Sequence, residues 1–319
     1  MKKNIALIAG GDSGEYEISV LSAKNVMTDL DKERFNVYLI IAKYGNWTFE
    51  QNNTVFNVDK TDFSLNINGL KVHFDAAFIM IHGTPGENGL LQGYFDMLGI
   101  KYTGCSALVS ALTFDKSFCN EVVRNFHIVN VAKHIAITRN SPLDLDNIIA
   151  QTGFPSFVKP SQGGSSLATF KVMNKAELEK AIAEAFKVDN KVLVEQFIKG
   201  RELTCGVFNE EAFPVTEIVT EREFFDYEAK YLGMSKEITP AQISDNLKTQ
   251  IQTAALQIYQ RLGCKGVCRV DFIYDETSNE IYFLEINTVP GQSPQSIVPQ
   301  QVRAMGKTTA WLYNSLLEI

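Results

Sequence analysis

The first hundred residues alternate short apolar runs with a longer stretch that has helical spacing. The apolar runs, which we predict to be strands, are residues 4–9, 36–41 and 76–81. A helix is predicted at residues 18–30, between the first two strands. This alternation predicts an open, mainly parallel sheet with crossover helices. Ligands of such sheets bind at the carboxyl ends of the strands, where polar turns follow at residues 10–15 and 82–89.

The middle of the chain has a different pattern. Its predicted strands are residues 156–159, 167–172 and 192–195, with a helix at 176–186 after the capping residue Asn174. The pattern is typical of a small α+β domain. Between the first two strands lies a loop rich in glycine and serine, residues 159–166, whose backbone N–H groups can hold phosphate. Taken alone, this loop also fits an exposed hairpin.

The last part of the chain begins with further short apolar runs. Its predicted elements are strands near 203–208 and 212–218, a helix at 245–262, a hairpin of strands 266–274 and 280–287, and a C-terminal helix. The charged aromatic run 221–231 fits either an ordered flap or a surface helix with its aromatic side chains in the core. Residues 46–71 are expected to form hairpins and loops.

The predicted hairpin carries a group of polar side chains. Glu285 and Asn287 share one face of the second strand, and Arg269 and Asp271 share one face of the first. A carboxylate in a buried strand needs a cation, hydrogen-bond donors or solvent. Carboxylate and amide oxygens suit Mg2+, which substrate phosphates usually complete. The hairpin alone leaves both a metal site and a solvated face open.

Composition and charge narrow the possible partners. With 319 residues and 45% hydrophobic content, the chain can bury the cores of two or three domains. A net charge of -7 argues against general affinity for nucleic acid or an anionic membrane, and no apolar segment approaches the length of a membrane span. The short apolar run after the first residues reads as a strand rather than as a signal peptide.

The five cysteines are odd in number and form no C-x-x-C pair. Cys264 and Cys268 have the spacing C-x3-C, with no second pair and no nearby histidine, so the spacing does not favour a zinc site. Reduced thiols in a cytoplasmic protein are the simplest interpretation.

Eight short blocks follow one another in a specific order: GGDSGEYEIS, IHGTPGENG, TFDK, FVKPSQGGSS, VLVEQFIKGRELT, FFDYEAKY, CRVDF and FLEINTVPG. Together they resemble the D-alanine:D-alanine ligases of the ATP-grasp superfamily over nearly the whole chain. The resemblance implies a three-domain ATP-grasp architecture of α/β and α+β type. The expected domains are 1–115, which contributes to the substrate site, the central domain 116–202, and the C-terminal domain 203–319 with the metal site and lid. ATP is then held between the last two.

The resemblance also implies roles for individual residues. Asp271, Glu285 and Asn287 match the ligands of two Mg2+ or Mn2+ ions. The residues that match ATP contacts are Lys116, Lys159, Ser166, Glu195, Gln196, Phe197, Ile198 and Glu202. In this match the lysines hold the phosphates, the strand edge 195–198 pairs with adenine, and Glu202 binds the ribose.

The catalytic residues implied by the resemblance are Glu15, Ser165, Tyr231, Arg269 and Gly291. Glu15, Ser165 and Tyr231 match a network at the first D-alanine, beside His82. Arg269 and the backbone N–H of Gly291 match the groups that stabilise an oxyanion. Lys230, Ser296 and Ile297 match the surroundings of the second D-alanine.

The implied reaction is ATP-dependent ligation of two D-alanine molecules through an acyl phosphate, which releases ADP and phosphate and supplies a peptidoglycan precursor. ATP and D-alanine are the expected partners, and a homodimer is expected from the resemblance. One alternative is a ligase that uses D-lactate, against which Tyr231 argues because those relatives typically carry phenylalanine there. Another is a nucleotide-binding ATP-grasp protein without turnover, which is disfavoured by the complete set of site residues. Ala168 and Gln292 depart from the usual glycine and apolar residue of the family.

Overall fold

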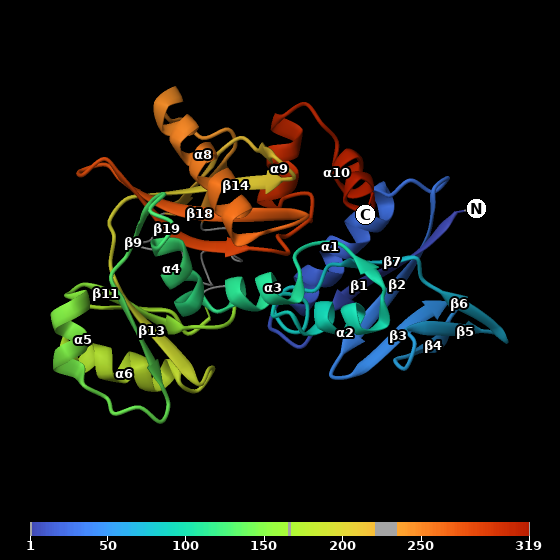
Figure 1. Cartoon of the computed structure of the whole chain (residues 1–319), viewed down its shortest axis with the longest axis horizontal. Helices are drawn as coiled ribbons and strands as arrows, with labels where there is room; N and C mark the ends of the chain where they lie inside the picture. Colours follow the sequence, from blue (N-terminus) through green and yellow to red (C-terminus); the bar gives the residue numbers. More distant parts are fainter. Residues whose placement is uncertain (1, 165–166, 221–234, 319) are drawn as a thin grey trace.

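The computed structural model describes residues 2–164, 167–220 and 235–318. In this part of the chain the strands form three sheets, and three hydrophobic clusters accompany them (Figure 1). The predicted combination of α/β and α+β regions is therefore confirmed. The helices of these residues include none that is both long and apolar enough to cross a membrane.

The N-terminal sheet has eight strands in the order β6-β5-β4-β3-β2-β1-β7-β8. Its strands are β1 (Lys3–Gly10), β2 (Phe35–Lys43), β3 (Asn46–Gln51), β4 (Thr54–Asp59), β5 (Ser64–Ile67), β6 (Leu70–His73), β7 (Ala76–Ile79) and β8 (Lys101–Tyr102). Strands β2, β1, β7 and β8 are mutually parallel, as the alternating pattern predicted. Strands β3 to β6 extend the sheet with antiparallel pairs, so the whole sheet is mixed.

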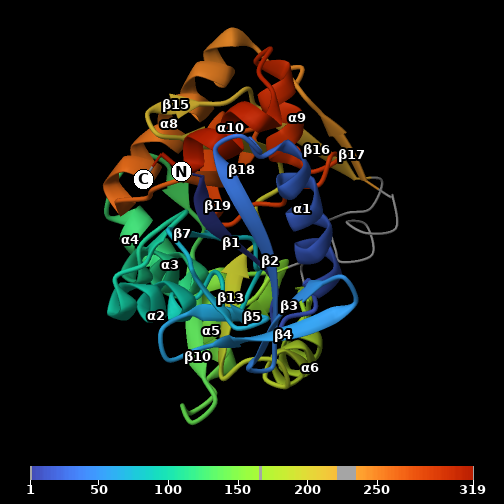
Figure 2. The same ribbon diagram turned by 90° about the vertical axis from the view of Figure 1, so that its right-hand side faces the viewer.

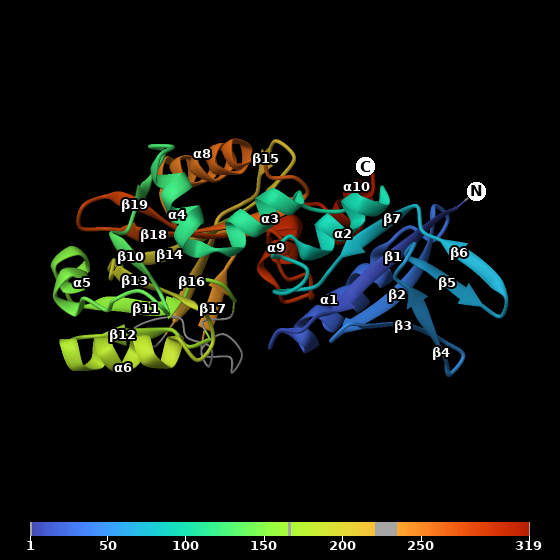
Figure 3. The ribbon, with the colours of Figure 1, turned by 60° about the horizontal axis from the view of Figure 1, so that its bottom comes forward.

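Local turn chemistry explains the antiparallel extension. Strands β3 and β4 are joined by Asn52 and Asn53 at φ 51° and 59°, and β5 and β6 by Asn68 and Gly69 at φ 52° and 88°. Two-residue hairpin turns with positive φ at both positions match the twist of antiparallel strands. Asparagine and glycine tolerate that conformation well. The segment of expected hairpins and loops thus adds a sheet extension at one end of the molecule (Figure 3).

The first and last helices of the chain pack together. Helix α1 (Tyr16–Asp29) contacts α10 (Thr309–Leu316), and Asn25 Nδ2 donates to Tyr313 Oη at 3.1 Å. Leu312, Tyr313 and Leu316 are buried in the same hydrophobic cluster as the residues of β1. Figure 2 shows α10 above the N-terminal sheet, close to α1. The C-terminal end of the chain therefore completes the N-terminal core. Helix α2 (Leu90–Leu98) adds Leu91 and Phe95 to it.

The central sheet has four strands in the order β10-β13-β11-β12. Its elements are β10 (His134–Thr138), α5 (Leu145–Thr152), β11 (Ser156–Pro160), β12 (Phe170–Val172), α6 (Lys175–Ala185) and β13 (Lys191–Gln196). Asn174 caps α6 by accepting a hydrogen bond from the Glu177 N–H, as its position predicted. Strand β12 begins at Phe170, three residues later than expected, because residues 167 and 168 form a turn.

The C-terminal sheet has the strand order β17-β16-β14-β18-β19-β9, and β15 pairs with β14. Its elements are β9 (Asn130–Val131), β14 (Arg201–Phe208), β15 (Glu211–Ala212), β16 (Thr216–Thr220), β17 (Ser235–Ile238), α8 (Asp245–Leu262), β18 (Val267–Asp275), β19 (Glu280–Asn287) and α9 (Ile297–Ala304).

Two helices from earlier in the chain share the core of the C-terminal sheet. They are α3 (Ala107–Phe114) and α4 (Lys116–Arg124), which supply the buried residues Val109, Cys119 and Val123. Asp115 lies between these helices and caps α4. The expected division of the chain at 115/116 thus falls at the junction of two helices that pack on one sheet, and it stays a prediction.

Candidate active site

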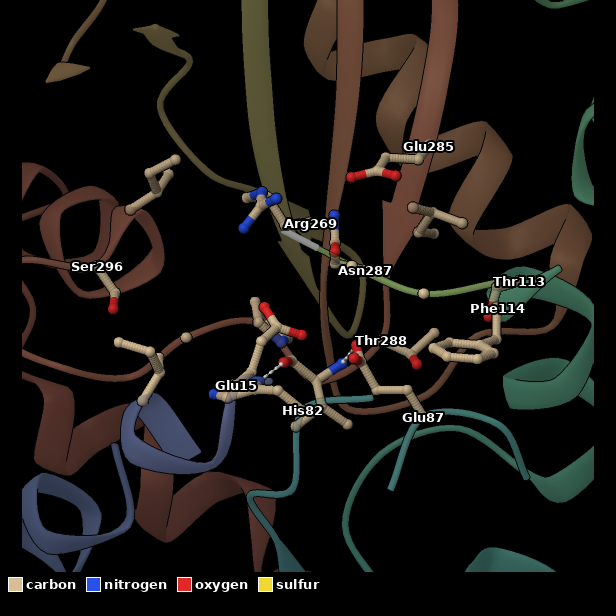
Figure 4. A pocket seen from close by; sticks show the side chains of 18 of the residues that line it. Glu15, His82, Glu87, Thr113, Phe114, Arg269, Glu285, Asn287, Thr288 and Ser296 are labelled. Atoms are coloured by element: carbon tan, nitrogen blue, oxygen red, sulfur yellow. Dashed lines mark hydrogen bonds between the residues drawn. The ribbon is translucent and has the colours of Figure 1, made fainter. Parts of the chain in front are cut away.

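A cavity of about 290 Å³ lies between the carboxyl ends of β1 and β7 and the end of the β18–β19 hairpin (Figure 4). Both polar turns after the N-terminal strands contribute to its lining, because the parallel strands end at the same edge of their sheet. Among the lining residues are Glu15, His82, Glu87, Lys116, Gly164, Arg269, Glu285, Asn287, Gly291, Ser296 and Ile297. Residues that are far apart in the sequence therefore meet around one cavity.

The predicted hairpin is confirmed, and its register brings the polar group together. Asp271 lies opposite Glu285, and Arg269 lies opposite Asn287. The Asp271 carboxylate accepts hydrogen bonds from Arg269 Nε at 2.8 Å and Nη2 at 2.7 Å, from Asn287 Nδ2 at 3.0 Å, and from the Thr204 hydroxyl. Asp271 is only 3% exposed, whereas Glu285 and Asn287 line the cavity. Asp271 therefore lies behind the cavity lining and orients Asn287 and Arg269.

Two cations accompany the hairpin carboxylates. Burial alone would lower the pKa of Arg269, but the adjacent Asp271 raises that pKa above its usual range. Lys116 Nζ lies 3.6 Å from Glu285 Oε2. The oxygens of Glu285 and Asn287 are hard ligands of the kind that Mg2+ prefers, and the anionic Asp271 stands directly behind them. This donor set fits a divalent cation.

The base of the glycine-rich loop is attached to the start of α4. The backbone N–H of Lys116 donates to Ser161 O at 2.9 Å, and its Nζ donates to Gly163 O at 2.6 Å. A Cβ atom on Gly164 would lie 2.7 Å from Glu15 Oε2, so the backbone of the loop approaches the N-terminal turn closely. The loop thus connects the central sheet to the N-terminal turn that carries Glu15.

Asp115 links the start of α4, the glycine-rich loop and β13 through its carboxylate. Its Oδ1 accepts hydrogen bonds from the hydroxyls of Ser117 and Ser161, both at 2.7 Å, and its Oδ2 accepts from Lys191 Nζ at 2.6 Å. Burial alone would raise the pKa of Asp115, but these bonds and one from Gln162 lower it to about 2. The sequence did not single out Asp115, because its partners Ser161, Gln162 and Lys191 come from other segments.

The predicted ATP residues of the central sheet lie apart from the lining of this cavity. Lys159 Nζ is 2.5 Å from Glu195 Oε2, and Asn120 Nδ2 donates to Glu195 Oε1 at 2.9 Å. The backbone N–H groups of Gln196 and Phe197 already donate to Lys133 O and Pro155 O. The edge of residues 195–198 can therefore meet a base only through other backbone groups.

Glu202 lies on β14, opposite Ile273 of β18. Its negative charge contributes to raising the pKa of Arg269. This predicted ribose contact is thus near the hairpin cluster, whereas Lys159 and Glu195 belong to the neighbouring sheet.

The N-terminal wall is built around His82. Its Nδ1 lies 2.8 Å from Val289 O, and its Nε2 lies 3.5 Å from the Ser22 hydroxyl. Glu15 precedes α1 as its N-terminal capping residue and also lines the cavity. Figure 4 shows Glu15 and His82 on the side of the cavity that faces Arg269 and Asn287.

Glu87 is a site residue that sequence reasoning missed. Burial and the nearby charge of Glu15 raise the pKa of Glu87 to about 7. Its carboxylate accepts from the backbone N–H of Gly83 at 2.7 Å and of Val289 at 3.2 Å, which partly offsets that rise. The only signal in the sequence was its place in a polar turn after a buried strand.

The remaining predicted substrate residues lie at the start of α9. Ser296 Oγ is 2.8 Å from Ser293 Oγ and accepts from the Ser293 N–H at 3.1 Å. A Cβ atom on Gly291 would lie 2.8 Å from Ser296 Oγ, so only glycine fits there without a shift. Ile297 lies next to them in the cavity lining. The other predicted site residues, Ser165, Ser166, Lys230 and Tyr231, fall outside the described part of the chain.

Comparisons with known proteins agree with this architecture. Residues 4–105 match the family model "D-ala D-ala ligase N-terminus", and residues 123–318 match "D-ala D-ala ligase C-terminus". A D-alanine--D-alanine ligase of Parabacteroides distasonis is 46% identical over 311 residues, covering 96% of this chain and 94% of that protein. One of Phocaeicola vulgatus is 44% identical, covering 96% and 95%.

Two solved structures have the same fold. The VanG D-Ala:D-Ser ligase from Enterococcus faecalis has a TM-score of 0.90 at 33% identity and covers 99% of each chain. D-alanyl-alanine synthetase A from Vibrio cholerae has a TM-score of 0.88 at 28% identity, covering 99% of this chain and 97% of the other. The sheets and the cavity between them thus define a ligase of ATP-grasp architecture. The chain belongs to the D-alanine–D-alanine ligase family.

Proposed function

We propose that this chain ligates two D-alanine molecules to D-alanyl-D-alanine with ATP, as a step of peptidoglycan precursor synthesis that serves the cell wall and cell shape. The observation that carries this function is the cavity in which Glu15 and His82 face Arg269, Glu285 and Asn287. The D-lactate alternative is disfavoured because the relatives at 44–46% identity are named for D-alanine.

Binding of the first D-alanine uses opposite charges across the cavity. Its ammonium group lies toward Glu15, and its carboxylate lies toward Arg269 and the backbone of Gly291. This carboxylate attacks the γ-phosphorus of ATP, ADP leaves, and an acyl phosphate forms.

The neutral amine of the second D-alanine then attacks the carbonyl carbon of the acyl phosphate, and negative charge develops on the carbonyl oxygen. The amine loses a proton and phosphate leaves as the C–O bond to it breaks. Preorganised donors aimed at the carbonyl oxygen typically contribute about 3–4 kcal/mol. Arg269 suits this role because Asp271 holds its guanidinium through two hydrogen bonds.

ATP is held by Lys116 and Lys159 through its phosphates, with Glu202 toward the ribose and residues 195–198 along the base. Two Mg2+ or Mn2+ ions are held by Glu285 and Asn287, with Asp271 as the third ligand or as the group that orients Asn287. Such ions neutralise phosphate charge while the γ-phosphoryl group moves.

Water must be excluded from the site, because it would hydrolyse the acyl phosphate. We assign this task to the segment that contains Lys230 and Tyr231, together with Ser165 and Ser166 of the loop. These residues lie outside the described ranges, and their roles rest on the matching sequence blocks. Ser296 and Ile297 supply a donor and an apolar contact for the second D-alanine.

The organisation of the whole protein follows the same family pattern. We propose domains 1–115, 116–202 and 203–319, a cytoplasmic location, and a homodimer, with no nucleic acid or membrane as partner. A feature that supports a second copy is the exposed apolar surface of α2 and α3. Leu90, Met97 and Leu108 are 63%, 81% and 77% exposed there.

The function is tested by phosphate release from ATP and Mg2+ with D-alanine, L-alanine, D-lactate and D-serine offered separately. Rapid release with D-alanine, and D-alanyl-D-alanine as the product, is expected. Faster ligation with D-serine or D-lactate would mean that this compound, and not D-alanine, is the acceptor. Absence of release with every amino or hydroxy acid, from a protein that still binds ATP, would favour the non-catalytic alternative.

A further inference from the structure

Three cysteines that are far apart in the sequence meet beneath the surface. Cys105 follows β8, Cys264 follows α8, and Cys268 lies in β18. Their Sγ atoms all lie within 4.8 Å of one another, and those of Cys105 and Cys268 are 3.7 Å apart. All three are buried, free thiols. This group, which we call the thiol cluster, lies outside the cavity described above.

The geometry of the thiol cluster suits a single bound ion. Sulfur ligands about 2.3 Å from a common ion, with bond angles of about 95–120°, lie about 3.4–4.0 Å from one another. The sulfurs of Cys105 and Cys268, at 3.7 Å, already have such a separation, and the other two separations need to shorten by about 1.4 Å or less. No histidine or carboxylate joins the three sulfurs within the described residues. The donor set is therefore sulfur alone, which selects soft, thiophilic ions.

The thiol cluster lies close to the surface of the protein. Cys105 Sγ accepts a hydrogen bond from the Lys265 backbone N–H at 3.4 Å, next to Cys264. Gly263 and Lys265, which flank Cys264, are exposed. A small ligand thus has only this short turn to cross.

Charge decides which class of ion fits. Three thiolates around Zn2+ leave a net charge of -1, and around Cu+ a net charge of -2, and a buried net charge is costly. Structural Zn2+ also takes four ligands almost always. A trivalent ion with three thiolates is neutral and needs no fourth ligand. We propose that Cys105, Cys264 and Cys268 form a binding site for a trivalent thiophilic ion, with arsenite as its simplest source.

The binding step balances without any change of oxidation state. Arsenous acid, As(OH)3, exchanges its three As–O bonds for three As–S bonds. Each departing hydroxide takes the proton of one thiol and leaves as water. Three thiols and one arsenous acid therefore give one neutral trithiolate and three waters, with no oxidant or reductant.

Occupancy of the thiol cluster should affect the active site through β18. Cys268 directly precedes Arg269 in that strand. The segments that carry the cysteines also touch, since a Cβ atom on Gly266 would lie 2.8 Å from Gly104 Cα. Three short As–S bonds would draw these segments together and move Arg269. This consequence rests on the proposed function, whereas the binding itself does not.

Binding is tested with the purified, reduced full chain and arsenite, by native mass spectrometry and by counting the thiols that still react after unfolding. The parent should gain one arsenic and lose three reactive thiols. Cys105→Ser and Cys268→Ser should each weaken binding at least tenfold. Cys205→Ser is the matched control, because Cys205 is buried outside the cluster and a serine hydroxyl can keep its hydrogen bond to Phe213 O. Circular dichroism establishes that each variant is folded.

Three results would overturn the proposal. They are no arsenic on the folded parent, equal weakening in the Cys205→Ser control, and tighter binding of Zn2+ or Cu+ than of arsenite in parallel titrations. Should a cluster variant fail to fold, protection of Cys105, Cys264 and Cys268 in the parent, located by peptide mapping, decides the question. Turnover is measured separately: bound arsenic should lower kcat with little change in the KM for ATP. If arsenic binds but kcat does not change, the binding site is supported and its coupling to catalysis is refuted.

Discussion

The cavity has a hairpin wall, formed by β18 and β19, and an N-terminal wall. The carboxylates of these two walls have different partners. On the hairpin wall, Asp271 is paired with Arg269, and Glu285 lies near Lys116. On the N-terminal wall, Glu87 is held by backbone N–H groups, and its pKa is raised to about 7. Carboxylates thus have two electrostatic surroundings within a single site. Those of the hairpin wall are paired with cations, whereas Glu87 of the N-terminal wall is buried near a second carboxylate, and its pKa lies near neutral pH.

The largest expected loss of activity would come from removing a carboxylate of the hairpin wall. Glu285→Ala should lower turnover by on the order of 100-fold or more, since it removes a cavity-facing carboxylate that we propose as a metal ligand. Its stability should change little, because Glu285 is partly exposed. Asp271→Ala should lower turnover similarly and also cost about 3–5 kcal/mol of stability, because it leaves the mostly buried Arg269 without its carboxylate.

The measurements are steady-state kinetics at limiting and saturating Mg2+, and denaturant unfolding. Glu285→Gln, which keeps the shape of the side chain, is the control for packing. Near-parental activity of Glu285→Ala at limiting Mg2+ would remove this residue from the metal site. Equal stability of the two alanine variants would show that Asp271 has no special supporting role.

The next prediction distinguishes the proposed ATP site from the proposed site of the second D-alanine. Lys159→Ala should raise the KM for ATP about 10- to 100-fold, because a bond to a charged group contributes about 1.5–3 kcal/mol. Ser296→Ala removes a hydroxyl from the lining of the cavity and should raise the KM for the second D-alanine more modestly. Kinetics that vary one substrate at a time distinguish the two. The same pattern in both variants would contradict the assignment.

The N-terminal wall should make the stability of the protein depend on pH. The pKa of Glu87 is higher in the folded protein, about 7, than its ordinary value of 4.5. Protonation therefore favours the folded state, and this stability is fully present below pH 4.5 and is lost as pH rises through 7. Glu87→Gln should remove up to roughly 3 kcal/mol of this pH dependence. Urea unfolding at pH 5 and pH 8 measures it.

In the parent protein, the free energy of unfolding should fall between these two pH values by more than in Glu87→Gln. Glu285→Gln provides the comparison from the hairpin wall. An unchanged difference between pH 5 and pH 8 in Glu87→Gln would mean that this carboxylate is not the group that titrates.

The two walls also differ in how much of them the sequence predicted. The hairpin was predictable because its two strands alternate and are separated by one polar turn, so Asp271, Glu285 and Asn287 could be placed on one face. Glu87 was not, because the Val289 N–H that holds it comes from 202 residues later in the chain. Asp115 has the same difficulty, since its partner Lys191 is 76 residues away. Patterns predict local strands and faces, whereas a raised or lowered pKa depends on which segments meet in space.

The smallest expected effect concerns the turn that leads out of the glycine-rich loop between the walls. Ala168 has φ 53°, in the left-handed region that favours glycine. Ala168→Gly should therefore stabilise the protein by about 1 kcal/mol. Ala183→Gly, at an exposed position in the last turn of α6, is the matched control and should destabilise the protein by up to a similar amount. Thermal unfolding measures both, and destabilisation by Ala168→Gly would show that the turn gains nothing from glycine.

The packing of α10 against α1 sets an order of events during synthesis. Proteins are made from the N-terminus, and domains usually fold as they leave the ribosome. Here Leu312, Tyr313 and Leu316 belong to the core around β1, so the core of the first sheet cannot be completed until residue 316 has been translated. The wall that carries Glu15, His82 and Glu87 is thus finished only after the hairpin that it faces. A nascent chain released before α10 would expose this core, so burial of the N-terminal cluster depends on the synthesis of α10.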